Sequence, residues 1–194
     1  MMKKLMTLMA VAIFIAISAH AQSTEATLKS EIKTLKKDGA SGKAEKKKDR
    51  KELRKLEGTE ASYQAKQKFA TDFGDLPVTK WVRSDNFDEA TFNKDGKVYV
   101  AYYDPDADLV GTITSADFKN LPEVAQKFIH KHYSGYTVGE VKFFDDNEYN
   151  DSDILMYGDQ FDGPDSYFVE LKKGGKIILV RSDVQGNVSF FKAL

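Results

Sequence analysis

Apolar residues recur at every fourth position near residue 60, a spacing that places them on one face of an α-helix. Thr59 can cap the N-terminus of this helix, and Gly74 is suited to end it. The pattern predicts a helix that buries one face. The residues of that face are Ala61, Ala65, Phe69 and Phe73.

A second helix is indicated by a longer amphipathic pattern. Pro122 is suited to the first helical position, and Ser134-Gly135 ends the pattern. We expect the whole apolar face of this helix to point inward, with His132 as a half-buried structural residue. The face contains Leu121, Val124, Ala125, Phe128, Ile129, His132 and Tyr133.

Short alternating or apolar runs lie between and after these helices, and such runs are typical of β-strands. Glycines in residues 94–97 and 173–176 predict tight hairpin turns, so both sheets should be antiparallel. The order of helix, strands, helix, strands predicts an α+β fold. The expected strands are residues 80–83, 89–93, 97–103, 109–114, 138–144, 167–172, 177–182 and 187–191.

The two halves of this region resemble each other. Residues of the first helix and first strand correspond to residues 60 positions later in the chain. Farther along, the matching positions are 79 residues apart: the segment 97–100 corresponds to 176–179, and Asp104 corresponds to Asp183. The change of offset places a longer loop at residues 145–165. We interpret residues 58–194 as two tandem units, about 58–117 and 118–194, each a helix packed on an antiparallel sheet.

Residues 1–21 have the pattern of an export signal. Lys3 and Lys4 precede an apolar run from Leu5 to Ile17, and Ala19-His20-Ala21 is a small-x-small cleavage site. No later segment is long and apolar enough to span a bilayer. The sequence therefore predicts a periplasmic or extracellular protein that begins at Gln22.

Residues 22–57 form a charged arm of two predicted helices around a flexible joint. The arm contains 12 basic and seven acidic residues, a net charge of +5, whereas residues 58–194 contain 15 basic and 23 acidic residues, a net charge of −8. One interpretation is that the arm contacts an anionic surface such as lipid or an envelope polymer. The alternative is a solvated helical extension, because acidic residues are interleaved and no apolar face accompanies the charge.

Several kinds of catalysis have no support in this sequence. The chain has no cysteine, no Gly-x-Ser-x-Gly motif and no glycine-rich phosphate loop. His130 and His132 lie about 200° apart around a helix, so they cannot chelate one metal ion together. The basic arm has no aromatic residue for base stacking, and the rest of the chain is acidic, so nucleic acid is not an expected partner. We expect a protein that is not an enzyme.

Two acidic segments are candidate calcium sites, because alternating carboxylates can converge on one hard cation. Leu109 stands where a calcium loop needs glycine, and Ser115 stands where it needs glutamate, so solvated turns are the favoured interpretation. No other cofactor is indicated. The candidate ligands are Asp104, Asp106 and Asp108 in the first segment, and Asp145, Asp146, Asp151 and Asp153 in the second.

The strand at residues 97–103 has apolar or aromatic side chains on both of its faces. Val98, Val100 and Tyr102 point one way, and Tyr99, Ala101 and Tyr103 point the other, although a helix can cover only one face. An uncovered aromatic face is typical of a protein-binding site, unless the sheets of the two units bury it. The candidate contact residues are Trp81, Tyr99 and Tyr103.

The chain also resembles a known family. Asn120 to Val124 open a helix, Tyr133-Ser134-Gly135-Tyr136 close it, and a strand lies around Val141 to Phe144. Together with the paired Lys-x-Gly-Lys hairpins at 94–97 and 173–176, these features resemble the PepSY-like, β-lactamase-inhibitor-like group of bacterial secreted proteins. The resemblance covers residues 59–194 and implies tandem units of a helix on an antiparallel sheet. It also implies binding or inhibition of another protein through the exposed sheet, with no catalytic residue to carry over.

These observations predict a secreted, non-enzymatic protein that binds another envelope or secreted protein through a sheet face. Two alternatives remain open at this stage. One is an envelope-associated protein tethered by residues 22–57, and the other is a calcium-binding protein that uses the acidic loops.

Overall fold

The computed structural model describes residues 27–28, 30, 48–49, 52–53, 55–56 and 58–194. The chain divides into two compact units, residues 1–60 and 61–194. The described residues before Gly58 are helical, and Leu28 and Leu53 form a small buried pair. The predicted signal and most of the predicted arm lie outside the described residues.

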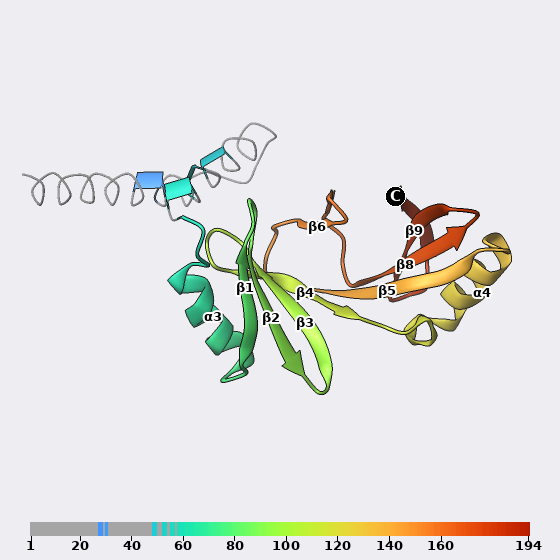
Figure 1. The fold of residues 1–194 in the computed structure, drawn as a ribbon, viewed down its shortest axis with the longest axis horizontal. Coiled ribbons are helices and arrows are strands. Elements are labelled where there is room, and N and C mark those ends of the chain that lie inside the picture. Colours follow the sequence, from blue (N-terminus) through green and yellow to red (C-terminus); the bar gives the residue numbers. More distant parts are fainter. Residues whose placement is uncertain (1–26, 29, 31–47, 50–51, 54, 57) are drawn as a thin grey trace, which may run out of the picture. The chain divides into compact units, whose positions relative to one another are not determined.

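One antiparallel sheet of eight strands organises residues 61–194 (Figure 1). We expected two separate sheets, and this was wrong, because β4 pairs with β5 from Gly111 opposite Asp146 to Ser115 opposite Lys142. The sheet order is β1-β2-β3-β4-β5-β8-β9-β10. The strands are β1 (Val78–Arg83), β2 (Asp88–Lys94), β3 (Lys97–Tyr103), β4 (Leu109–Ser115), β5 (Thr137–Asp146), β8 (Ser166–Lys173), β9 (Lys176–Asp183) and β10 (Val188–Ala193).

Helix α3 (Tyr63–Phe73) covers the first four strands. Its N-cap is Ser62 rather than the predicted Thr59, because the Ser62 hydroxyl accepts a hydrogen bond from the amide of Ala65. Gly74 ends the helix at φ 72°, as predicted. The buried face of α3 packs its phenylalanines against aromatic rings of the sheet. The contacting rings are Phe69, Phe73, Trp81, Phe92 and Tyr99.

Helix α4 (Glu123–His132), preceded by the short 3-10 helix η1 (Phe118–Asn120), covers the last strands. Ala125 and Ile129 are buried against the sheet. The predicted inward face is only partly correct, because Val124, Phe128 and His132 are exposed on the far side of the helix. The ring of His132 stacks on Phe128, with 3.9 Å between ring centroids, instead of entering the core.

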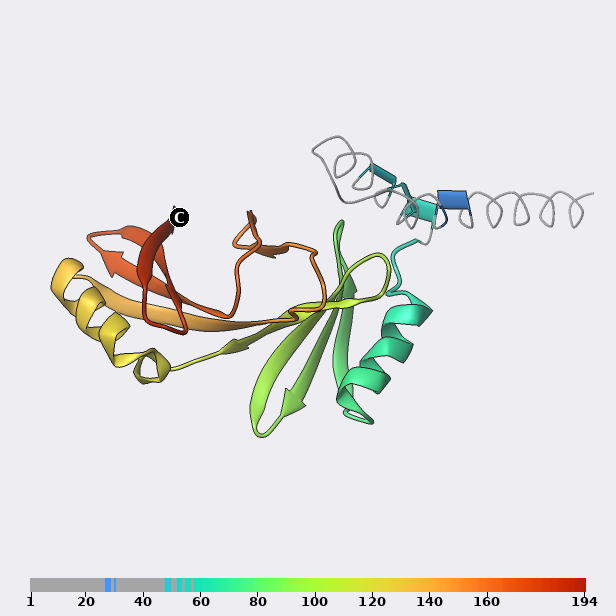
Figure 2. The ribbon, with the colours of Figure 1, turned by 180° about the vertical axis from the view of Figure 1, so that it is seen from behind.

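Both helices lie on the same face of the sheet. Directly opposed residues share a face, and the series Tyr99, Thr114, Phe143 and Tyr167 crosses from β3 to β8. Tyr99 packs under α3 at one end of this series, and Tyr167 packs under α4 at the other. Figure 2 shows the same arrangement from behind.

Residues 145–165, predicted as a loop, contain a small hairpin of β6 (Ile154–Met156) and β7 (Asp159–Phe161). We call residues 145–165 the acidic insertion. Ile154, Met156 and Phe161 of the insertion are buried against Phe144 and Phe168 of the main sheet. Phe144 and Phe168 belong to the face opposite the helices, so the insertion covers the centre of that opposite face.

The turns that follow β3 and β9 have the same hydrogen bonds. In the first turn Asp104 Oδ1 accepts bonds from the amides of Asp106 and Asp108, and in the second Asp183 Oδ1 accepts them from Gln185 and Asn187. The backbone bonds of the two turns also correspond. The predicted relation between Asp104 and Asp183 therefore has a matching local geometry, while the duplication itself stays a prediction.

Candidate protein-binding face

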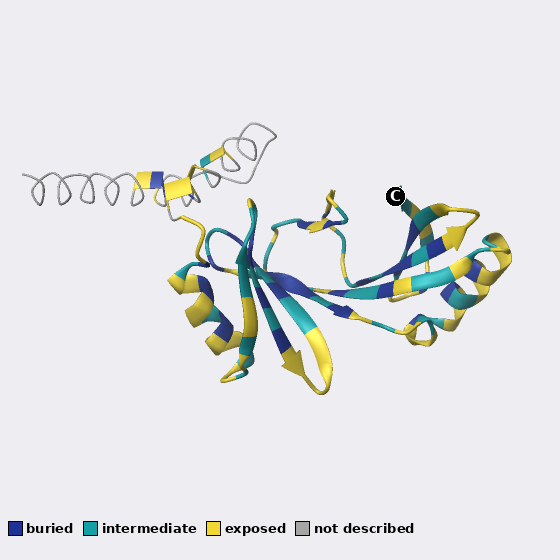
Figure 3. Ribbon diagram, in the orientation of Figure 1, coloured by how far each residue is buried: buried dark blue, intermediate teal, exposed yellow. Residues whose placement is uncertain are grey.

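The two faces of β3 have different surroundings. Ala101 and Tyr103 are fully buried in the core beneath α3. Because side chains alternate along a strand, Val98, Val100 and Tyr102 lie on the opposite face, which neither α3 nor α4 covers. Figure 3 shows that β3 is exposed at its hairpin end and more buried toward the centre of the sheet.

The candidate contact residues named from the sequence are not on that open face. Tyr103 is fully buried, and its hydroxyl donates a hydrogen bond to Asp72 of α3 at 3.3 Å. Burial, together with the Asp72 carboxylate, raises the pKa of Tyr103. Trp81 and Tyr99 are partly buried against the same core. Helix α3 covers the face on which these three residues lie, so Tyr103 is in the core, while partner contact through Trp81 and Tyr99 stays a prediction.

The open face carries an apolar stripe of its own, which we call the helix-free stripe: Val98, Val100, Tyr102 and Ile113. Val98 is 55% exposed, and Ile113 lies directly opposite Val100 on β4. Tyr102 is edge-on to Phe87 at 5.8 Å, and burial, with a contribution from Glu89, raises the pKa of Tyr102 to about 12. The Tyr102 hydroxyl therefore stays neutral at physiological pH.

The helix-free stripe reaches the acidic insertion. Tyr102 and Ile113 are partly buried against the cluster that contains Ile154, Met156 and Phe161. Other apolar side chains of the insertion point to solvent, since Tyr149 is 96% exposed and Leu155 is 39% exposed. The sequence analysis did not single out Tyr149, although an isolated tyrosine in a polar segment is a signal that could have found it.

The acidic insertion accounts for the negative charge of the folded region. The insertion contains eight acidic and no basic residues. The rest of residues 58–194 therefore contains 15 acidic and 15 basic residues and has no net charge. Burial and the nearby Asp165 raise the pKa values of Asp145 and Asp146 above the usual aspartate range. Burial is the larger cause, Asp165 adds like-charge repulsion, and Lys94 partly offsets the shift at Asp145.

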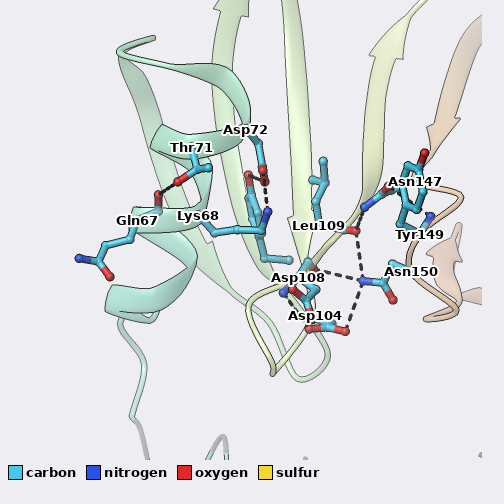
Figure 4. A network of polar contacts seen from close by, with 11 residues as sticks. Gln67, Lys68, Thr71, Asp72, Asp104, Asp108, Leu109, Asn147, Tyr149 and Asn150 are labelled. Atoms are coloured by element: carbon cyan, nitrogen blue, oxygen red, sulfur yellow. Dashed lines mark hydrogen bonds and ion pairs between the residues drawn. The ribbon is translucent and has the colours of Figure 1, made fainter.

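The two candidate calcium segments come together in space (Figure 4). The Asp104 carboxylate accepts hydrogen bonds from the hydroxyl of Ser152 at 2.9 Å and from the side-chain amide of Asn150 at 3.4 Å, besides those of its own turn. Asp153 accepts a hydrogen bond from Gln160. Within the described residues, no group of three or more His, Cys, Asp or Glu side chains is arranged to hold a metal ion.

The other calcium candidates have separate positions. Asp106 and Asp108 supply backbone amides to Asp104 in the turn. Asp145 is exposed on β5, whereas the backbone amide of Asp146 donates to Asp165 at 2.8 Å. Asp151 is exposed at the start of the segment that leads to β6. In this arrangement Asp104 acts as a hydrogen-bond acceptor that ties two loops together, and calcium binding stays an untested prediction.

Solved structures with the same architecture come from Bacteroides. A BLIP-like protein of Bacteroides fragilis aligns with a TM-score of 0.54 at 17% identity, over 69% of this chain and 86% of its own. The chain has a BLIP-like fold. A DUF2874 family protein of Bacteroides uniformis aligns with a TM-score of 0.55 at 14% identity, over 69% of this chain and 88% of its own.

A protein of Bacteroides eggerthii that is inferred to be periplasmic aligns with a TM-score of 0.54 at 13% identity, over 69% of this chain and 88% of its own. These identities show a common fold and do not transfer an activity. The β-lactamase-inhibitor-like resemblance is thus confirmed for the fold, and its PepSY-like part stays a prediction. No family model and no curated protein matches the chain.

The described part of the chain has no helix of the length and apolar character that a membrane span requires.

Proposed function

We propose that this chain is a non-enzymatic protein-binding module of the bacterial envelope, and that the helix-free stripe contacts its partner. The observation that carries the proposal is the exposure of Val98, at 55%, beside the partly buried Val100 on the sheet face opposite α3 and α4. Exposed apolar patches beside a rigid sheet are typical of protein interfaces. The BLIP-like fold supports the same role.

The position of the stripe suits binding for a second reason. Strand β3 pairs with β2 on one side and with β4 on the other, which holds its backbone in place, so little backbone freedom is lost when a partner docks. Tyr149 and Leu155 add exposed apolar area on the neighbouring insertion. The tandem-unit interpretation also belongs to this proposal, because two helix-and-strand units joined edge to edge produce one wide sheet.

The test uses residues 22–194 immobilised on a support and an envelope extract from the source bacterium. Val98→Glu places a charge in the helix-free stripe, and Val124→Glu makes the same change at a 67% exposed position on α4. We expect Val98→Glu to abolish capture of a discrete protein that the wild type and Val124→Glu both retain. Equal capture by all three chains would show that the stripe is not the contact surface.

Export of the chain is part of the same proposal. The pattern of residues 1–21 and the periplasmic assignment of a neighbour with this fold support it. A fusion of residues 1–21 to a periplasm-dependent reporter should give reporter activity, and a fusion with Lys3 and Lys4 changed to Glu should give less. Cytoplasmic retention of the full chain would contradict this part of the proposal.

A further inference from the structure

The helix-free stripe lies beside a strong concentration of negative charge. All eight charged residues of the acidic insertion are acidic, while the rest of the folded region is neutral. The insertion packs against Tyr102 and Ile113, which are themselves members of the stripe. Any partner that covers the stripe therefore meets the acidic insertion at its border.

Several basic residues lie near the insertion, and they differ in their carboxylate partners. Lys142 and Lys172 pair with Glu140 and Glu170 of the main sheet, at 3.3 Å and 3.1 Å. Lys192 pairs with Asp159 of the insertion at 2.9 Å. Lys94 also acts on Asp145, whose pKa it lowers. Glu148 and Asp162 of the insertion are exposed, so their charges are accessible to a partner.

We infer that the partner is a protein with a basic amphipathic segment, whose apolar side chains cover the helix-free stripe and whose lysines or arginines lie against the acidic insertion. This inference rests on the proposed function and adds the chemistry of the partner. Apolar burial supplies affinity at the stripe, while the charges of the insertion raise the association rate and reject acidic proteins. Such steering falls as salt rises.

The test uses three fluorescent peptides with blocked ends. The peptides KLKLKLK and KQKQKQK have the same net positive charge, but only the first contains apolar residues. The peptide ELELELE keeps the leucines and has a negative net charge. Binding to residues 22–194 is measured by fluorescence anisotropy at low and high salt, and the contact surface is mapped by amide chemical-shift changes. We expect KLKLKLK to bind at least about tenfold more tightly than either other peptide, and to shift the amides of Val98 and Val100.

Variants separate the two contributions. The double variant Glu148→Gln, Asp162→Asn removes two exposed charges of the insertion. It should lower the affinity for KLKLKLK about three- to tenfold, chiefly through slower association. Asp75→Asn with Asp85→Asn removes the same charge from exposed positions elsewhere and should have little effect. Val98→Glu should remove the advantage of KLKLKLK over KQKQKQK.

Equal binding of KLKLKLK and ELELELE, with both peptides shifting the amide of Val98, would overturn the inference that the partner is basic. The proposal that this face binds a protein would still stand. Equal binding of KLKLKLK and KQKQKQK, with no shift at Val98, would count against both proposals. Salt-sensitive self-association of the full chain that KLKLKLK disrupts would make a second copy the occupant and would also overturn the inference.

Discussion

Asp88 is a single buried carboxylate that joins three elements. Its Oδ1 accepts a hydrogen bond from the Arg83 guanidinium at 2.8 Å, and its Oδ2 accepts one from the backbone amide of Ser62 at 3.0 Å. The side chains of Arg83 and Asp88 are 4% and 0% exposed. A buried ion pair of this kind adds modest net stability when complete, but removal of one charge leaves the other uncompensated in the core.

We therefore expect Asp88→Asn to lower the free energy of unfolding by about 3–5 kcal/mol. The matched control is Asp117→Asn, because Asp117 pairs with Lys119 at an exposed site and should cost less than about 1 kcal/mol. Urea titration of both variants measures the difference. Similar small losses in both variants would show that the buried pair does not hold α3 to the first hairpin.

Asp145 and Asp146 give the acidic insertion a pH response, to which burial contributes most and Asp165 next. Because burial and Asp165 raise the pKa values of Asp145 and Asp146, the folded chain binds their protons more tightly than the unfolded chain does. Their contribution to stability is therefore present at acidic pH and is lost as pH rises through the raised pKa values. Near neutral pH, the repulsion among these carboxylates opposes folding.

Asp165→Asn should raise the melting temperature at pH 7, because it removes a negative charge and keeps an oxygen to accept the amide of Asp146. The gain should shrink as pH falls toward the ordinary aspartate pKa, about 4, where wild-type carboxylates are protonated as well. Melting curves of both chains from pH 3 to pH 7 measure it. A variant that is less stable than wild type at pH 7 would contradict this account of the insertion.

Among the elements, locally encoded features were predicted best. The two helices, the eight long strands and the turns at 94–97 and 173–176 agree with the structure within a few residues, because helical spacing, alternation and glycine turns are properties of short segments. The hairpin of β6 and β7 was missed, because two three-residue strands in an Asp-rich segment carry no periodic pattern. Its burial depends on contacts with distant strands.

Phe161 is the main aromatic anchor of that hairpin. Its ring meets Phe144 at 5.9 Å and Phe168 at 5.2 Å, and the Arg181 guanidinium lies 4.9 Å from its centroid. We expect Phe161→Ala to cost about 3–5 kcal/mol and to speed amide hydrogen exchange within the acidic insertion before the main sheet. Leu155→Ala, at a 39% exposed position of the same hairpin, should be nearly neutral. Uniformly faster exchange across the sheet would argue against a locally anchored insertion.

At the scale of the whole molecule, the sequence predicted that β3 is apolar on both faces but not which face is available to a partner. Alternation along β3 correctly indicated apolar residues on both faces, of which α3 covers one and the acidic insertion covers part of the other. It could not say which face α3 covers, because that depends on how the helix packs against strands far away in the sequence. The continuity of the sheet was also beyond local patterns, since β4 and β5 pair across an intervening helix.

Gly111 lies at the junction between the two halves of the sheet. A Cβ at this position would lie 2.5 Å from the backbone oxygen of Asp145 and 2.6 Å from the ring of Phe144. We expect Gly111→Ala to destabilise the fold by about 1–3 kcal/mol or more and to broaden or split its unfolding transition, because it pushes β4 and β5 apart.

Gly139→Ala is the control, because the nearest group to its Cβ is the movable carboxylate of Glu170, at 2.7 Å. Calorimetry compares both variants with wild type. A single sharp transition in Gly111→Ala, with the same loss as in Gly139→Ala, would show that the halves do not depend on a tight junction.

Phe144 and Ser166, the residues that flank the acidic insertion, are directly opposed across β5 and β8. The chain thus leaves and re-enters the sheet at neighbouring positions, so a segment of almost any length can close between them at small entropic cost. The part of the insertion after Asp146 can be exchanged for another binding segment while Asp145 and Asp146 keep their pairing with β4. Related chains could diversify there, and designed binders could be grafted there, provided that the graft keeps Phe144 and Phe168 covered.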